Sequence, residues 1–107
     1  PAFLPKESWA RVMNGLDKHY GTDASLDPQS IKEISQWLNQ NAGTYKRVSS
    51  APPNDRITES TWFIKKHRKI SDTTWKSSKV KSKSNCMACH TSADKGNYDD
   101  DDVRVPK

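Results

Sequence analysis

Apolar residues recur at helical spacing in two stretches of the first half of the chain. In residues 6–20, one helix face carries Trp9, Val12, Met13, Leu16 and Tyr20. In residues 28–41, a second stripe that we expect to be buried carries Ile31, Ile34, Trp37 and Leu38. This spacing predicts two amphipathic helices. Asp27 and Pro28 suit the start of the second helix, and a glycine follows each helix, Gly21 and Gly43.

The next stretch of the chain predicts a loop and then a short helix. A loop is expected over residues 44–56, because the adjacent prolines 52 and 53 forbid a helix there. A short helix is expected over residues 60–68, around the consecutive apolar residues Trp62, Phe63 and Ile64.

Polar residues dominate the segment that follows. Residues 70–83 are rich in Ser, Thr and Lys and predict a loop, which Trp75 and Val80 would anchor. A last short helix is expected to begin at Ser84 or Asn85, either of which can cap it. No stretch alternates with a period of two, so the pattern predicts a mostly α fold without a sheet.

The composition is polar for a chain that folds alone. Of 107 residues, 32% are apolar and 29% are charged, and the mean hydropathy is −1.01. The length predicts one small domain over residues 1–107, with an ordered helical part over 1–93 and a polar, acidic tail over 94–107 that is extended or mobile. So polar a chain cannot bury a large core with side chains alone. Either part of it is disordered or a cofactor supplies apolar mass.

Neither a membrane span nor a secretory signal peptide is recognisable in the sequence. No stretch reaches the roughly 20 apolar residues that a membrane-spanning helix needs, and no basic-then-apolar signal peptide stands at the start. The sequence begins at Pro1 without a methionine. We therefore expect a mature or trimmed product, or a piece of a longer protein, without a membrane span.

Charge is distributed unevenly around a net value of +5. Two basic clusters and one acidic run stand out: Lys65, Lys66, Arg68 and Lys69; Lys76, Lys79, Lys81 and Lys83; and Asp99 to Asp102. Such runs are typical of solvated faces, and they also suit an electrostatic docking rim around a redox centre. Nucleic acid is disfavoured as a partner, because no stackable aromatics are interleaved with the basic residues in a recognised motif.

One motif carries specific chemistry. Cys86-Met87-Ala88-Cys89-His90 has the Cys-x-x-Cys-His pattern of haem c attachment. Two thiols three positions apart lie on one helical turn, from which they can form thioethers with the two vinyl groups on one porphyrin edge. The histidine that follows projects its imidazole under the ring. The motif therefore predicts haem c bound through Cys86 and Cys89, with His90 on the iron.

Two other uses of the motif stay open. Cys86 and Cys89 could form a disulfide or a thioredoxin-like pair, although that motif normally lies in a βαβ context, which is absent here. Cys86, Cys89 and His90 could bind zinc. Adjacent Cys89 and His90 are awkward ligands for one tetrahedral ion, and the sequence has no second cysteine pair.

An iron that transfers electrons needs a second strong axial ligand. Outside the motif the histidines are His19 and His67, which each end a predicted helix beside apolar residues and which also fit structural roles. Met13 is a softer candidate. Met87 lies within the motif and cannot reach the opposite face of the ring.

An ordered series of short motifs resembles the bacterial dihaem cytochromes c over nearly the whole chain. The matching segments are Leu4-Pro5-x-x-Ser8-Trp9, Met13-x-x-Leu16-x-x-His19-Tyr20-Gly21-x-Asp23-Ala24-Ser25-Leu26, Arg56-Ile57-Thr58-Glu59, Trp62-Phe63, His67, Ser84-Asn85-Cys86-x-Ala88-Cys89-His90 and Gly96-x-Tyr98. Very many cytochromes share the haem motif alone, so the ordered series makes the resemblance specific.

The resemblance implies a small helical c-type cytochrome domain with long loops, whose helices pack around haem. It implies two haems c in the intact protein, both with two histidine ligands. Cys86 and Cys89 would hold one haem with His90 as its proximal ligand, and His19 and His67 would be the distal ligands of the two haems. Either histidine could serve the haem at Cys86, and His67 is favoured because it is nearer in the chain and follows an aromatic pair.

The family's first attachment motif lies upstream of the segment that matches Pro1 onward. We therefore expect this chain to be the family's C-terminal portion, with one haem attached here and a second in the intact protein.

The expected function is that of a periplasmic electron carrier and not of an enzyme. In the family, partners include a small oxygen-binding cytochrome c and membrane b-type cytochromes, which the resemblance alone implies. The alternatives are a small haem enzyme or a haem-based sensor domain with a displaceable sixth ligand, and a haem-free thiol or metal-binding domain.

Overall fold

The computed structural model describes residues 1–44, 48 and 50–106. These residues form two compact units, Pro1–Lys65 and Lys66–Lys107, which are described separately below. Helices and turns make up the described residues, which hold no strand, and this confirms the predicted mostly α fold. That residues 1–107 fold as one domain stays a prediction.

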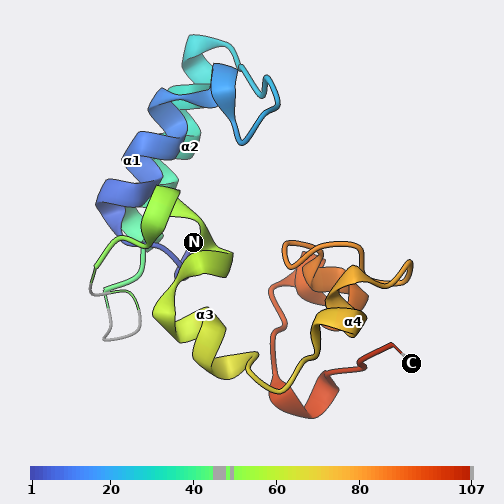
Figure 1. The fold of residues 1–107 in the computed structure, drawn as a ribbon. Helices are drawn as coiled ribbons and strands as arrows, with labels where there is room; N and C mark the ends of the chain where they lie inside the picture. The colour runs from blue at the N-terminus through green and yellow to red at the C-terminus, as the bar shows by residue number, and fades with distance from the viewer. Residues whose placement is uncertain (45–47, 49, 107) are drawn as a thin grey trace. The chain divides into compact units, whose positions relative to one another are not determined.

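Two helices form the centre of the first unit. They are α1, Lys6–Asn14, and α2, Pro28–Asn41, which lie side by side in Figure 1. The bounds of α2 agree with the sequence prediction. Its start is fixed by Asp27, whose carboxylate accepts the backbone N–H of Ser30 at 3.0 Å.

The helix predicted over residues 6–20 is interrupted, so that part of the prediction is wrong. The α-helix ends at Asn14, and Gly15 leaves the helical region with φ −124° and ψ 33°. The chain continues as a short 3-10 turn, Leu16–Lys18. Glycine destabilises helix interiors because it loses more backbone entropy than other residues there, and this allows the break.

A small apolar core lies between α1 and α2. Met13, Leu16 and Leu38 are buried in it, and four partly buried residues pack against them: Trp9, Val12, Ala24 and Ile31. The predicted stripe of α2 is only half buried, because Ile34 and Trp37 are 39% and 53% exposed. The prediction was wrong for these two residues, which are not among those that pack against the core.

The end of α2 approaches the N-terminal segment closely. The N–H of Gly43 donates to the carbonyl of Leu4 at 2.8 Å, and Leu4 is almost fully buried. A Cβ atom on Gly43 would lie 2.5 Å from the carbonyl oxygen of Ala2. The same segment stacks on the third helix, since the rings of Phe3 and Trp62 have centroids 5.1 Å apart.

The third helix, α3, is Thr61–Lys66, shorter than predicted. Its start is stabilised by Ser60, whose hydroxyl accepts the N–H of Phe63 at 3.1 Å. Residues 45–47 and 49 of the loop predicted before it lie outside the described residues.

The second unit contains a helix that the sequence did not predict. Within residues 70–83, expected to be a loop, lies α4, Asp72–Lys76. The hydroxyl of Ser71 accepts the N–H of Thr74 at 3.2 Å and caps the helix. A serine cap amid other Ser and Thr residues gives little sequence signal, which explains the miss.

The helix predicted to begin at Ser84 or Asn85 is a single 3-10 turn, Cys86–Ala88, with no side-chain cap. The amide of Asn85 instead donates to the carbonyl of Val80 at 2.8 Å. Val80 is 1% exposed, consistent with its predicted role as an anchor.

Residues 94–106 do not run extended as expected. They contain parts of two 3-10 turns, Ala93–Lys95 and Asp100–Asp102. The N–H of Arg104 donates to the carbonyl of Cys89 at 2.9 Å, which connects this segment to the haem motif. Lys107 lies outside the described residues. No helix in the described part of the chain is long and apolar enough to cross a membrane.

Candidate haem site

The predicted attachment residues share one tight turn. The carbonyl of Cys86 accepts the N–H of Cys89 at 3.3 Å and that of His90 at 2.8 Å. Both cysteines are free of disulfides and partly exposed. The turn therefore presents two reduced thiols and the histidine that follows them on one short segment, as covalent attachment to a porphyrin edge requires.

The second thiol of the motif is partly enclosed. Burial, and then the charge of Cys86, raises the pKa of Cys89. A thioredoxin-like pair normally lies in a βαβ context, and the described residues hold no strand. The fold therefore disfavours the thioredoxin-like alternative. Among the described residues, no three His, Cys, Asp or Glu side chains are grouped so as to hold a metal ion.

His67 and His90 lie close together within the second unit. Their ring centroids are 6.3 Å apart and the ring planes cross at 74°. A metal–imidazole bond is about 2 Å long, so two imidazoles on opposite sides of one metal have ring centres roughly 6 Å apart. The separation of His67 and His90 thus fits one iron bound between them.

The electrostatics at His90 favour its ligand form. Burial lowers the pKa of His90 most, the positive charge of His67 lowers it further, and Asp100 opposes both. Imidazole binds metals in its neutral form. The histidine is therefore ready to bind iron without first losing a proton at neutral pH.

Two aromatic residues flank this histidine pair. The ring centroid of Trp75 is 6.0 Å from that of His67, and the centroid of Tyr98 is 5.3 Å from that of His90. The ammonium of Lys83 lies 6.0 Å from the centroid of Trp75. Sequence reasoning took Trp75 only as a loop anchor and Tyr98 only as part of a resemblance. Their places beside the histidines depend on tertiary contacts that carry no local signal.

His19 belongs to the first unit and stands at the start of a tight turn. Its N–H donates to the carbonyl of Thr22 at 2.8 Å, and the N–H of Thr22 donates back at 3.0 Å. The two central residues, Tyr20 and Gly21, have φ values of +50° and +88°. Positive φ at both central positions is the signature of the type I′ turn, which fixes the backbone of His19.

A pocket of about 530 Å³ adjoins His19 in the first unit. Its lining combines three cations with polar and apolar side chains: Arg11, Val12, Gly15, Lys18, His19, Tyr20, Asn54, Asp55 and Arg56. The ring of Tyr20 meets the ring of His19 edge-on, with centroids 4.9 Å apart. The structure thus places one of the two candidate distal histidines in each unit.

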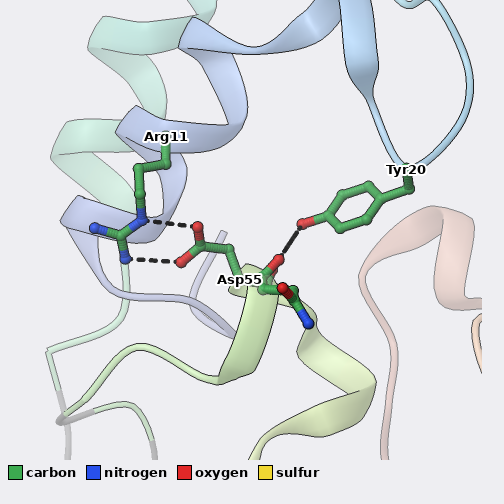
Figure 2. Close-up of polar contacts among 4 residues, drawn as sticks. Arg11, Tyr20 and Asp55 are labelled. Atoms are coloured by element: carbon green, nitrogen blue, oxygen red, sulfur yellow. Dashed lines mark hydrogen bonds and ion pairs between the residues drawn. The ribbon is translucent and has the colours of Figure 1, made fainter.

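Residues that line this pocket form a polar network, and Figure 2 draws contacts among Arg11, Tyr20 and Asp55. Arg11 donates two hydrogen bonds of 2.8 Å to Asp55. The hydroxyl of Tyr20 donates to the carbonyls of Asn54 and Asp55 at 3.1 and 2.9 Å. The guanidinium of Arg56 lies 4.5 Å from the ring centroid of Tyr20. These contacts hold Tyr20 at its positive φ, which costs about 1 kcal/mol or more for a residue other than glycine.

The methionines have other surroundings. Met13 is 7% exposed and belongs to the core between α1 and α2, whereas Met87 is 50% exposed. Met13 therefore serves as a packing residue in its unit.

Comparison with known proteins places the chain among cytochromes. The family model of the dihaem cytochromes c matches residues 1–98. No curated protein matches the sequence.

Solved structures of dihaem cytochromes c are similar over most of the chain. The X-ray structure of the dihaem cytochrome c from Shewanella baltica OS155 has 36% identity and a TM-score of 0.83, over 97% of this chain and 78% of that one. The crystal structure of the cytochrome purified from Rhodobacter sphaeroides has 41% identity and a TM-score of 0.76, over 91% of this chain and 81% of that one. The chain therefore belongs to the dihaem cytochrome c family, which indicates a haem-binding protein of electron transfer.

Proposed function

We propose that this chain is a periplasmic electron carrier that holds one haem c through thioethers to Cys86 and Cys89. His90 and His67 would be the two axial ligands of its iron. The observation that carries the proposal is the 6.3 Å separation of the two imidazole rings in the unit that also contains the attachment motif. When bound, the haem supplies the one-electron change between ferric and ferrous iron.

The two histidines would lower the reduction potential of the iron and restrict access to it. Two histidine ligands donate strongly to iron and lower the reduction potential relative to His/Met ligation. With both histidines bound, the iron would have no open position, and oxygen or peroxide would have to displace a ligand before reacting. The protein would thus hold the haem and set its potential without catalysing bond chemistry.

His19 is the proposed axial ligand of a second haem. The family is dihaem, and His19 stands on a fixed turn beside a pocket of about 530 Å³. Both cysteines of the 107 residues belong to the motif at Cys86 and Cys89, so this sequence holds the thioethers for one haem only. The haem that His19 would bind would therefore be attached through residues other than Cys86 and Cys89.

A partner would dock on the basic rim, defined as Lys76, Lys79, Lys81 and Lys83. All four side chains are exposed, and they precede the haem motif in the second unit. A positive rim attracts an acidic surface and speeds encounter more than it tightens the complex. The partners implied by the resemblance, a small oxygen-binding cytochrome c and a membrane b-type cytochrome, are proposed on this ground.

The test is a count of haems and ligands in the holoprotein produced with haem c attachment in a bacterial periplasm. A pyridine haemochrome assay should give one haem per 107-residue chain, and the ferric spectrum should be low-spin. His67→Ala should convert that haem to a high-spin form that binds cyanide within seconds, as an enzyme with an open site would. His19→Ala is the matched control and should leave the low-spin spectrum unchanged. A chain without a Soret band, or a spectrum that changes with His19 and not with His67, would overturn the proposal.

A further inference from the structure

The two candidate ligand rings of the second unit stand in crossed planes. The planes of His67 and His90 meet at 74°. An imidazole that binds a metal through one nitrogen can rotate about that bond, so coordination alone does not set the angle. Contacts of the protein with the ring must set it.

Each histidine has an aromatic neighbour that can do this. Tyr98 meets His90 with centroids 5.3 Å apart and planes inclined at 54°. Trp75 meets His67 at 6.0 Å and 44°. Both separations lie within the range of about 4.5–7 Å in which aromatic pairs have preferred tilted geometries. A rotation of either imidazole would change its tilted contact with this neighbour.

The backbone of Tyr98 is itself held in place. Gly96, with φ +79°, turns the chain just before it, and the N–H of Asn97 donates to the carbonyl of Ser92 at 3.1 Å. The side-chain oxygen of Asn97 accepts the N–H of Asp99 at 2.9 Å. Hydrogen bonds on both sides of Tyr98 therefore fix the position from which its ring meets His90.

Trp75 is held by different means. It lies in α4, whose start is capped by Ser71, and the ammonium of Lys83 lies 6.0 Å from its ring centroid. The two aromatic rings thus come from separate segments of the second unit, and each lies near a different histidine.

We propose that Tyr98 and Trp75 are positioning residues, which keep the planes of the axial imidazoles crossed. The inference rests on the proposed function, because the angle matters only when both histidines bind one iron. Crossed imidazoles leave the two π-type d orbitals of ferric iron nearly equal in energy, whereas parallel imidazoles separate them. The crossed arrangement gives a low-spin electron paramagnetic resonance signal with a very large principal g value, and it raises the reduction potential relative to parallel planes.

The experiment records frozen-solution electron paramagnetic resonance spectra and reduction potentials of the ferric holoprotein and four variants. The parent and Tyr98→Phe, which keeps the ring, should both give the large-g signal. Tyr98→Leu and Trp75→Leu should shift the largest g value downward or spread it over a broad range, and should lower the potential. Trp37→Leu, which removes an exposed indole of the first unit, is the matched control and should match the parent.

The outcomes separate this inference from the proposed function. A parent without low-spin ferric iron sinks the proposed function. A low-spin parent whose g values and potential survive both Tyr98→Leu and Trp75→Leu overturns the inference alone. The haemochrome assay confirms one haem in each variant compared, and if one leucine variant loses its haem, the other still decides the matter.

Discussion

Arg11 and Asp55, 44 positions apart in the sequence, form a two-pronged pair with both N–O distances at 2.8 Å. The pair connects α1 to the turn that carries the rim of the His19 pocket (Figure 2). Asp55 is the more enclosed partner, with 14% of its side chain exposed against 54% for Arg11. Paired hydrogen bonds of this kind fix geometry as well as charge.

The Arg11–Asp55 pair should make stability depend on pH in the acid range. The hydrogen bond from Arg11 lowers the pKa of Asp55 below its ordinary value of 3.8. A lowered folded pKa means that the pair stabilises the protein fully above pH 3.8, and that this stabilisation is lost as pH falls through the lower folded value. Arg11→Met should therefore reduce the urea midpoint at pH 7, and the difference from the parent should shrink below pH 3.8.

The matched control for that prediction is Lys6→Met, which removes a positive charge from the same helix. Its difference from the parent should stay small and should not follow the titration of Asp55. An Arg11→Met difference that persists unchanged at the lowest pH would show that lost packing, and not the ion pair, is responsible.

Gly43→Ala should destabilise the first unit by roughly 1–3 kcal/mol, as overpacked substitutions do. The new Cβ would lie 2.5 Å from the carbonyl oxygen of Ala2, which is backbone and cannot rotate away. Gly15→Ala is the matched control, because its Cβ would meet only Arg11 O at an ordinary 3.5 Å. Urea denaturation of both variants measures the effect, and equal stability of the two would contradict the close approach.

Ser8→Ala should leave the protein as stable as before, or stabilise it by up to about 1 kcal/mol. Ser8 is fully buried, and its hydroxyl has no hydrogen-bond partner among the described residues. The same hydroxyl is nevertheless near enough to Asp55 to help lower the pKa of that carboxyl. Substitution by alanine removes a buried hydroxyl that lacks a hydrogen-bond partner among the described residues, which is why no loss of stability is expected.

Ser60→Ala provides the contrast, because the Ser60 hydroxyl donates to Ile57 O at 2.8 Å and accepts the N–H of Phe63. Its removal should cost about 1 kcal/mol, as the loss of a helix cap does. If Ser8→Ala costs as much in the same urea titrations, the Ser8 hydroxyl does bond to Asp55.

Features made by residues close together in the sequence could be predicted, whereas features made by distant residues could not. The start of α2 and the haem motif are local, since Asp27 caps a neighbour three positions away and the motif spans five consecutive residues. The exposure of Trp37 could not be foreseen, because it depends on which neighbours cover α2. The ring planes of His67 and His90 cross, although the two residues are 23 positions apart. The segment between them contains α4, whose short serine cap gives little signal in the sequence, so this proximity could not be predicted.

The basic rim predicts a salt-dependent rate of electron transfer. Lys76→Glu with Lys79→Glu should slow oxidation of the ferrous holoprotein by ferricyanide, an anion, roughly tenfold at low ionic strength. The difference should fade as salt is added, because the Debye length shrinks to about 3 Å at 1 M. Stopped-flow mixing measures the rate, and the haemochrome assay should show unchanged haem content. The matched control is Lys6→Glu with Lys32→Glu, the same charge change placed in the first unit. If both double variants react equally at low salt, net charge and not the rim controls the encounter.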